Sequence, residues 1–439
     1  MKKQKIKTRV LSGFVELLPK EQIAFDKIKD TIKTVYAEFG FLPIDTPVIE
    51  RSEVLLAKAG GETEKQIYQF KKGNEDVALR FDLTIPLARY VAEHFPQLSF
   101  PFRRSQIAKV YRGERPQKGR YREFYQCDID IIGDGNLSLM NDAEMPNVIY
   151  TIFKRLNVGP FIICLNNRKL INGLMLEIGI NNLSVEVMRI IDKIEKIGEE
   201  STKEMLKEIG VSNENISSIF GFLSIKGTNT EIISKLRELS FKDKTFQTGV
   251  DELEEVISNI KLFGVPEDYF TIDLAVMRGH DYYTGTVYET NLVDYPEIGS
   301  VCGGGRFDNL AEKYTNKKLP GVGISIGLTR LFAQLRDVDL IKIDSLALAK
   351  VLIVPLSKDH ALSLRVASDL RKEGVSTSVY YEDVKIKKKM KYADNLGIPF
   401  VILIGEDEIN SNILTVKNME SSKQTKVPVG EIVKYFKNC

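Results

Sequence analysis

The chain has 439 residues, of which 43% are hydrophobic, and a formal net charge of only +2. This length predicts two or three domains with sizeable cores. The balanced charge excludes a uniformly basic nucleic-acid binder, so any basic surface must be local. Four cysteines without CxxC spacing and three scattered histidines argue against a metal site and against a disulfide framework.

The sequence also argues against a membrane protein. No stretch approaches the roughly 18 apolar residues of a transmembrane helix. The basic N-terminus is not followed by a signal-peptide core, because Gly13, Glu16 and Pro19 interrupt it. We therefore expect a soluble, cytoplasmic protein with free thiols and no membrane contact.

The first part of the chain predicts an α+β fold. A helix is expected at Lys20–Phe39, where apolar residues recur at helical spacing and Gly40 ends the pattern. The strand-like runs that follow are separated by turns rather than by crossover helices, and they are Val77–Phe81, Ser105–Tyr111 and Glu123–Ile132. This pattern predicts an antiparallel sheet flanked by helices.

The rest of the chain changes character twice. Asn172–Val256 is charged and helix-periodic, which predicts a helical insertion, and strands with glycines return at Phe270–Phe332. After a linker at Asp337–Ala349, strands and helices alternate as in a small parallel α/β domain. We therefore divide the chain into a core of residues 1–171 and 257–336, an insertion at 172–256 and a C-terminal domain at 350–439.

A basic run precedes a strand with a polar face. Arg103–Arg122 holds eight basic residues and one acid, Glu114. In the next strand, Gln126, Asp128 and Asp130 alternate with apolar residues and so share one face. A basic run is usually a solvated surface, but arginines beside a polar-lined pocket also suit a phosphate or nucleotide.

Three later segments are candidates for the same pocket. Met277–Glu289 combines Arg278 with two adjacent tyrosines, although a hairpin with surface aromatics explains it too. Cys302–Leu310 contains three consecutive glycines, which permit close backbone approach but suit a tight turn or bulge equally well. Pro320–Phe332 predicts a strand followed by a helix with Arg330 in its first turn. The glycines match neither a Rossmann fingerprint nor a P-loop.

Together these segments resemble the class II aminoacyl-tRNA synthetases and, within them, the histidyl-tRNA synthetases, over nearly the whole chain. Three segments are similar to class II motifs 1, 2 and 3, and they are Phe39–Glu50, Tyr111–Glu123 and Gly321–Leu331. Two are similar to the histidine-specific segments, namely Arg278–Gly285 (RGHDYYTG) and Gly303–Leu310 (GGGRFDNL), and Ala78–Tyr90 is a further match. One departure is His280, where the family would have a small or aliphatic residue.

The resemblance implies a role for each matching position. Arg112 and Arg278 would be the catalytic residues that hold the α-phosphate, Glu114 would meet the adenine amine, and Arg120 and Arg330 would bind the outer phosphates. The glycines of the GGGRFD run would form the floor beneath the ligand. Histidine would be bound by Asp82, Leu83, Thr84, Gln126, Asp130, Tyr282 and Tyr283.

The resemblance also implies an activity and its partners. The family activates L-histidine with ATP and transfers it to tRNA(His), with Mg²⁺ held mainly by the ATP phosphates and no metal site on the protein. Carboxylate and triphosphate repel each other, so fixed arginines at their meeting point suit this chemistry. The family further implies a homodimer joined through motif 1, and an anticodon-binding role for the C-terminal domain.

A lysine cluster in that domain has two explanations. Lys385–Lys391 contains five lysines, and helical spacing puts Lys385, Lys388 and Lys389 on nearly one face. The cluster is either a solvated helix face or a contact with RNA phosphates. Anticodon bases would instead meet a polar loop near Gly405–Glu408.

Three other functions compete with this interpretation. A regulatory subunit of ATP phosphoribosyltransferase would share the core, but relatives of that kind lack the third domain and the arginine at position 278. A class II synthetase for another amino acid would lack the RGHDYYTG and GGGRFDNL segments. A generic nucleotide-binding module would not require an RNA-binding domain.

Overall fold

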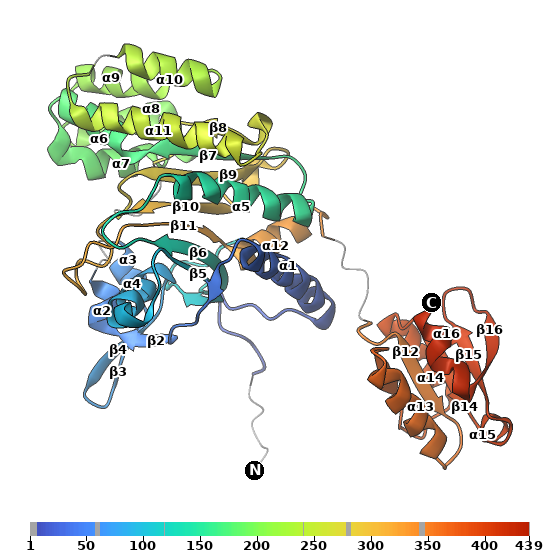
Figure 1. The fold of residues 1–439 in the computed structure, drawn as a ribbon. Helices are drawn as coiled ribbons and strands as arrows, with labels where there is room; N and C mark the ends of the chain where they lie inside the picture. Colours follow the sequence, from blue (N-terminus) through green and yellow to red (C-terminus); the bar gives the residue numbers. More distant parts are fainter. Residues whose placement is uncertain are drawn as a thin grey trace. The chain divides into compact units, whose positions relative to one another are not determined.

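The computed structural model describes residues 7–57, 62–117, 119–239, 241–277, 282–341 and 347–438. Contacts divide the chain into two compact units, one of Met1–Glu16 with Phe25–Ile341 and one of Leu17–Ala24 with Lys342–Cys439. The first contains a large sheet with helices around it, and the second contains a smaller sheet with its own helices (Figure 1). None of the helices described is both long and apolar enough to span a bilayer.

Eight strands form the large sheet, in the order β1-β5-β6-β11-β10-β9-β7-β8. The interior pairs are antiparallel, and only the edge pairs β1–β5 and β7–β8 are parallel. The sheet confirms the predicted α+β class. Its strands are β1 (Leu42–Pro43), β5 (Phe102–Tyr111), β6 (Glu123–Ile132), β7 (Phe161–Asn167), β8 (Phe270–Ile272), β9 (Thr286–Leu292), β10 (Cys302–Phe307) and β11 (Gly321–Ile326).

Three helices cover one face of this sheet, namely α1 (Pro19–Glu38), α5 (Met140–Leu156) and α12 (Leu328–Asp337). The Tyr36 hydroxyl on α1 donates to the Cys127 carbonyl on β6 at 2.9 Å. The rings of Phe25 and Phe332 join α1 to α12 at 5.4 Å. This packing buries the apolar face of β6, while the polar face of the strand points the other way. The helix predicted at Lys20–Phe39 is thus confirmed within one residue.

A smaller group of elements packs over part of the opposite face. It joins the sheet through an apolar cluster that includes Phe81, Ile85, Ile132 and Phe307. The strand predicted at Val77–Phe81 lies two residues earlier. The group contains β2 (Ile49–Arg51), α2 (Ser52–Leu56), α3 (Glu62–Gln66), β3 (Gln69–Lys72), β4 (Glu75–Leu79), α4 (Thr84–Glu93) and the short helix Phe95–Gln97.

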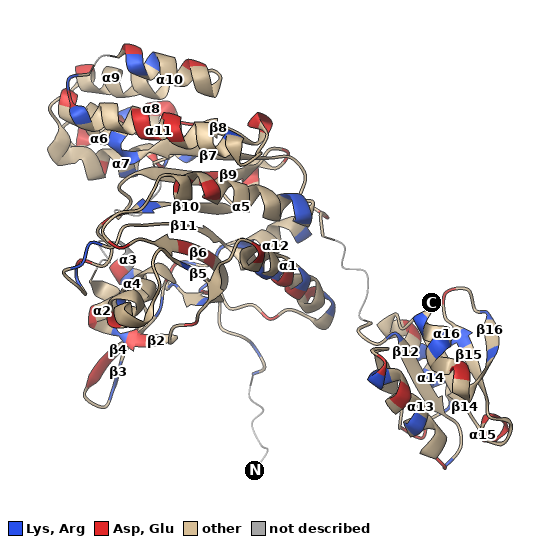
Figure 2. Ribbon diagram, viewed as in Figure 1, with Lys and Arg blue, Asp and Glu red and all other residues tan. Residues whose placement is uncertain are grey.

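The segment between β7 and β8 is helical, as the sequence predicts, and its helices begin before and end after the expected boundaries. Helices α6 and α11 pack closely because Gly173 has no side chain, and a Cβ there would lie 2.5 Å from Cβ of Phe246. Acidic and basic residues are interspersed over these helices (Figure 2). The helices are α6 (Arg168–Glu177), α7 (Ser184–Ile191), α8 (Ile194–Glu208), α9 (Asn213–Leu223), α10 (Asn229–Glu238) and α11 (Lys244–Leu262).

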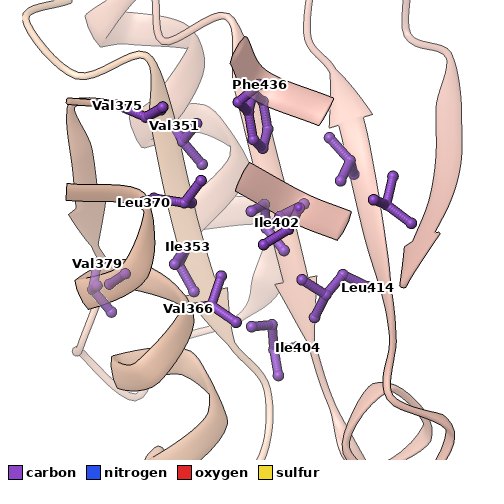
Figure 3. Close-up of a cluster of buried hydrophobic side chains, with 14 of the residues drawn as sticks. Val351, Ile353, Val366, Leu370, Val375, Val379, Ile402, Ile404, Leu414 and Phe436 are labelled. Carbon is purple, nitrogen blue, oxygen red and sulfur yellow. The ribbon is translucent and has the colours of Figure 1, made fainter. Parts of the chain in front are cut away.

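The second unit has a five-stranded sheet in the order β13-β12-β14-β15-β16. The first three strands are parallel, as predicted, and a hairpin adds two antiparallel ones. Val351, Ile353, Ile402 and Phe436 belong to its buried core (Figure 3). The elements are β12 (Val351–Pro355), α13 (Ala361–Lys372), β13 (Thr377–Val379), α14 (Ile386–Leu396), β14 (Phe400–Ile404), α15 (Glu406–Ser411), β15 (Ile413–Asn418), β16 (Gln424–Pro428) and α16 (Ile432–Lys437).

Two details of the second unit correct the predictions. Lys389 does not share an exposed face with its neighbours, because its side chain is buried and Nζ donates to the Pro355 carbonyl at 2.9 Å. Lys387 and Lys388 are exposed. The predicted loop near Gly405–Glu408 is instead the start of α15, where the Glu408 carboxylate accepts from the Gly405 amide at 3.0 Å.

Candidate active site

A cavity of about 370 Å³ opens on the polar face of the large sheet. Its walls come from β6, β10 and β11, the start of α4, the segment between β5 and β6, and the segment before β9. Residues separated by up to 264 positions in the chain therefore meet in one hollow. The lining residues are Gln66, Asp82, Thr84, Arg112, Glu114, Gly119, Arg120, Tyr121, Phe124, Gln126, Asp128, Asp130, Tyr282, Tyr283, Ser300, Val301, Cys302, Gly303, Gly304, Phe307, Gly323, Ile324, Ser325, Gly327 and Arg330.

The register of the sheet arranges these residues in rows across three strands, β5, β6 and β11. Asp130 on β6 lies between Arg104 on β5 and Gly323 on β11. The glycine is required there, because a Cβ on Gly323 would lie 2.1 Å from Oδ1 of Asp130. The next row pairs Asp128 with Ser325. The glycine-rich strands thus provide a floor with room for carboxylate side chains above it.

Three buried carboxyl groups form one end of the cavity. Burial raises the pKa of Asp82 to about 6 and that of Asp128 to about 7, and it raises the pKa of Asp130 as well. The Arg104 guanidinium opposes this effect on all three groups. Since three acids share that buried cation, this end of the cavity favours a positively charged ligand group.

Several oxygen atoms at this end have no hydrogen-bond partner within the described protein. They are Oδ2 of Asp82, Oε1 of Gln126 and Oδ1 of Asp128. Gln126 is nevertheless fixed, because its Nε2 donates to Oγ of Ser325 at 2.9 Å. Buried acceptors are normally satisfied, so these atoms are suited to N–H donors of a bound molecule.

Two tyrosines form an aromatic wall beside the acids. The rings of Tyr282 and Tyr283 lie 4.8 Å apart at 64°, and Tyr282 meets Phe307 edge-on at 6.1 Å. Burial raises the pKa of Tyr282 well above its ordinary value, which keeps the phenol protonated. Gly305 leaves space for this wall, because a Cβ there would lie 2.9 Å from the Tyr283 ring. The wall suits a flat, polar ring.

Arginines form the other end. The Arg112 guanidinium lies 5.2 Å above the Phe124 ring, and its Nε donates to the Phe81 carbonyl at 3.0 Å. Arg120 forms an ion pair with Glu114 at 3.3 Å, and Nη2 of Arg330 donates to the Ile298 carbonyl at 2.7 Å. Guanidinium groups bind phosphate oxygens with matching geometry. This end is therefore suited to a polyanion.

The segment that contains the tyrosines is anchored at both ends by one residue. The amide of Arg168, at the start of α6, donates to the Gly285 carbonyl at 2.9 Å, and its Nη1 donates to the Met277 carbonyl at 2.5 Å. Asn166 holds the carbonyls of Leu274 and Val276 at 3.1 Å each. The first helix of the insertion thus fixes the approach to the cavity wall.

The structure brings together nearly all the predicted site residues that it describes. Leu83 is the exception, because its side chain is buried in an apolar cluster and its carbonyl accepts from Arg104 at 3.3 Å. Arg278 and His280 lie outside the described residues. The residues that line the cavity as predicted are Asp82, Thr84, Arg112, Glu114, Arg120, Gln126, Asp130, Tyr282, Tyr283 and Arg330.

Other parts of the site were missed or misjudged. The sequence did not distinguish Arg104 from the other basic residues of Arg103–Arg122. Its pairing with Asp130 follows from the register of β5 and β6. The two alternatives for the later segments are wrong, because the tyrosines line a cavity and the three glycines lie in the interior strand β10. Gln66 and Tyr121 also line the cavity without any sequence signal.

The sheet, its glycine floor and a cavity with acidic and arginine-lined ends define a class II aminoacyl-tRNA synthetase. Comparison with known proteins gives the narrower group. The histidyl-tRNA synthetase model matches residues 13–331, and an anticodon-binding domain model matches residues 350–439. The chain belongs to the histidyl-tRNA synthetase family.

Individual relatives agree over the full length. The histidine–tRNA ligase of Clostridium tetani is 56% identical over 100% of both chains. The crystal structure of histidyl-tRNA synthetase from Nostoc has a TM-score of 0.89 and 39% identity, and it covers 99% of this chain and 100% of its own. The fold is also shared by an ATP phosphoribosyltransferase regulatory subunit/histidyl-tRNA synthetase from Bacillus halodurans. That structure is 20% identical, has a TM-score of 0.76, and covers 92% of this chain and 99% of its own.

Proposed function

We propose that the protein is a histidine–tRNA ligase, which converts L-histidine and ATP to histidyl-adenylate and pyrophosphate and then transfers histidine to the 3′ end of tRNA(His). One observation carries this proposal: a single cavity joins a buried acidic end, an aromatic wall and an arginine-lined end. Histidine has a cationic amino group and a flat polar ring, and ATP is a polyanion, so the two substrates match the two ends.

The acidic end is proposed as the histidine site. Asp82 and Thr84, at the start of α4, would hold the amino group together with Gln126, while Asp130 would accept from the ring. Tyr282 and Tyr283 would close over the imidazole. A site whose buried groups need a donor and an acceptor on the ring can reject other amino acids by roughly 10⁴–10⁵-fold without editing.

The arginine end is proposed as the ATP site. The histidine carboxylate attacks the α-phosphorus, forms the new P–O bond and expels pyrophosphate, so no protein nucleophile is required. Arg112 and Arg278 would hold the α-phosphate and stabilise charge on its oxygens, while Arg120 and Arg330 would hold the outer phosphates. Glu114 would accept from the adenine amine. Orienting the two substrates supplies a further part of the rate enhancement.

Mg²⁺ is proposed to enter with ATP. Phosphate oxygens and water are the ligands that this ion prefers when it binds a nucleotide. Within the described residues, no group of three or more His, Cys, Asp or Glu side chains is arranged to hold a metal. The arginines and Glu114 fit a nucleotide that brings its own ion.

The second reaction, transfer of histidine to tRNA, would involve the rest of the chain. The terminal tRNA hydroxyl attacks the histidyl carbonyl and displaces AMP. The unit with β12–β16 would hold the anticodon, in line with the domain model that it matches. The helical insertion would contact the acceptor stem rather than edit. We propose the domain division 1–171, 172–256, 257–336 and 350–439, with the insertion extended to Arg168–Leu262 so that it contains all of α6 and α11.

A homodimer in the cytoplasm completes the proposal. The segment similar to motif 1 exposes Leu42, Val48 and Ile49, and exposed apolar residues grouped on one segment are typical of an interface. Sedimentation of the purified full chain as a monomer at micromolar concentration would contradict the dimer.

The activity is tested by ATP–pyrophosphate exchange with each of the 20 amino acids. We expect exchange with histidine alone, and charging of tRNA(His) but not of other tRNAs. Exchange with a different amino acid would refute the substrate. The fold shared with the Bacillus halodurans protein favours a regulatory subunit as the second candidate. Binding of histidine without exchange would support that alternative.

A further inference from the structure

We propose that Arg104, which is not part of the cavity lining, is a positioning residue that sets the geometry and the charge of the amino-acid end of the cavity. The inference rests on the proposed function, because it concerns the histidine site. No part of the Arg104 side chain is exposed to solvent. It therefore acts through the residues that it contacts and not by touching a ligand.

One guanidinium joins two walls of the cavity. Nη2 of Arg104 lies 2.5 Å from Oδ2 of Asp130 on β6 and donates to the Leu83 carbonyl at 3.3 Å. Leu83 separates the lining residues Asp82 and Thr84 at the start of α4. The apolar cluster with Phe81, Ile85 and Ile132 also joins these walls, and Arg104 adds a polar bridge between them inside the site. A buried charge-assisted contact of this kind fixes orientation more strongly than a neutral one.

The surroundings of Arg104 are strongly acidic. Oδ2 of Asp128 lies 4.0 Å from Nη2, and Asp82 is close enough for the Arg104 charge to lower its pKa. Gln106 beside Arg104 accepts from Nη1 at 3.5 Å, and Arg104 lowers while Asp128 raises the pKa of Tyr36, whose hydroxyl donates to the Cys127 carbonyl. Arg112 adds positive charge on the side of Asp82.

Charge balance explains why this arrangement binds a cation. Three buried carboxylates without a counter-ion would be protonated rather than remain charged. Arg104 neutralises one of them and keeps the others closer to ionisation. The amino group of the substrate then neutralises the remaining negative charge. Without Arg104, the carboxyl groups would take up protons at higher pH and lose their affinity for that group.

The test compares Arg104→Met with Arg104→Lys and with a control on the same strand. The control is Arg103→Met, because Arg103 points to the opposite face, where it pairs with Glu144 at 2.8 Å and lies over Phe41. Pyrophosphate exchange of the full-length protein is measured from pH 6 to 9, with histidine and ATP varied separately. Melting temperatures are recorded for all variants.

For Arg104→Met we expect the KM for histidine to rise by about 10-fold to 100-fold, the value of one hydrogen bond to a charged group. The KM for ATP should change by less than about 2-fold. In the wild type and in the variant, the KM for histidine should fall as pH rises and the carboxyl groups ionise. In Arg104→Met this fall should occur at higher pH than in the wild type. Arg104→Lys should restore the pH range, because it restores the charge, but only part of the affinity, because one ammonium replaces a planar fork.

Three outcomes would overturn the inference. One is an equal rise in both KM values, and the second is a loss of activity in step with melting temperature as in Arg103→Met. Either would mean that Arg104 serves only the fold. The third outcome applies if Arg104→Met does not fold, and it is that Arg104→Lys has the wild-type KM for histidine and the wild-type pH profile. Absence of histidine exchange in the wild type would instead refute the proposed function itself.

Discussion

At the scale of single residues, the site depends on side chains that are absent as much as on those present. The Asp130 carboxylate occupies the space that a side chain at position 323 would need. A sheet interior is closely packed and does not yield to an added carbon. A Cβ here would also lie 2.5 Å from the Ile129 carbonyl of β6, so glycine at this position is required both by the cavity and by the pairing of β11 with β6.

We expect Gly323→Ala to displace Asp130 and to raise the KM for histidine by roughly 100-fold, because a misplacement of about 1 Å has effects of that size. Histidine-dependent pyrophosphate exchange measures the change. Gly221→Ala is the matched control, since Gly221 on α9 has no atom within 4 Å of an added Cβ. Equal activity of the two variants would contradict the role given to Gly323.

The acidic residues also predict a pH dependence. The pKa of Asp82 is raised to about 6 and that of Asp128 to about 7. An ionised carboxylate attracts an ammonium group and a protonated one does not, so we expect histidine affinity to be highest above pH 7 and to fall as pH drops through 7 and then 6. The stability of the unliganded protein changes in the opposite direction. Both carboxyl groups have a folded-state pKa above the unfolded value of 3.8, so the free energy of unfolding decreases as pH rises and the groups ionise.

Thermal shift assays with and without histidine at pH 6 and pH 8 measure both effects. We expect the unliganded melting temperature to be lower at pH 8 and the stabilisation by histidine to be larger there. Asp128→Asn should remove the step near pH 7. The ring of free histidine titrates in this range too, so a step that persists unchanged in Asp128→Asn belongs to the ligand and would refute the assignment to Asp128.

At the scale of elements, sequence periodicity predicted what depends on local pattern. The strand at Glu123–Ile132 has the predicted bounds, and its alternation correctly placed Gln126, Asp128 and Asp130 on one face. The role of Arg104 depends on the register between two strands, and the burial of Lys389 depends on a contact with Pro355 across its unit. Neither is encoded in a local pattern, so the sequence did not reveal them.

The contact between α6 and the tyrosine segment gives a prediction at the same scale. Arg168→Met removes the bond to the Met277 carbonyl while leaving its own amide bond to Gly285. We expect the KM for histidine to rise by about 10-fold as Tyr282 and Tyr283 lose their fixed position, with exchange as the measurement. Lys169→Met is the control, because Lys169 on the same helix pairs with Glu252 instead. Similar losses in both variants would indicate general damage to α6.

At the scale of the whole molecule, the two reactions are assigned to different parts of the chain. We propose that adenylate formation uses the cavity of the first unit alone, and that recognition of tRNA also involves the second unit, which matches an anticodon-binding domain model. The formal charge of +2 gives the protein little general attraction for RNA, so affinity must come from local groups. We propose the exposed lysines on α14 as such a group, whereas Lys389 is buried.

The double variant Lys387→Glu/Lys388→Glu separates the two reactions. We expect pyrophosphate exchange to be unchanged and the KM for tRNA(His) to rise by at least about 10-fold at low salt, with the difference shrinking as salt increases, because phosphate contacts depend on counter-ion release. Lys372→Glu, on α13 of the same unit and 73% exposed, controls for charge alone. Aminoacylation over 50–300 mM salt (a change of roughly 2.4-fold in screening length) measures both variants. If the tRNA KM of the double variant matches the wild type at every salt concentration, α14 is a solvated helix face and the second unit must hold RNA elsewhere.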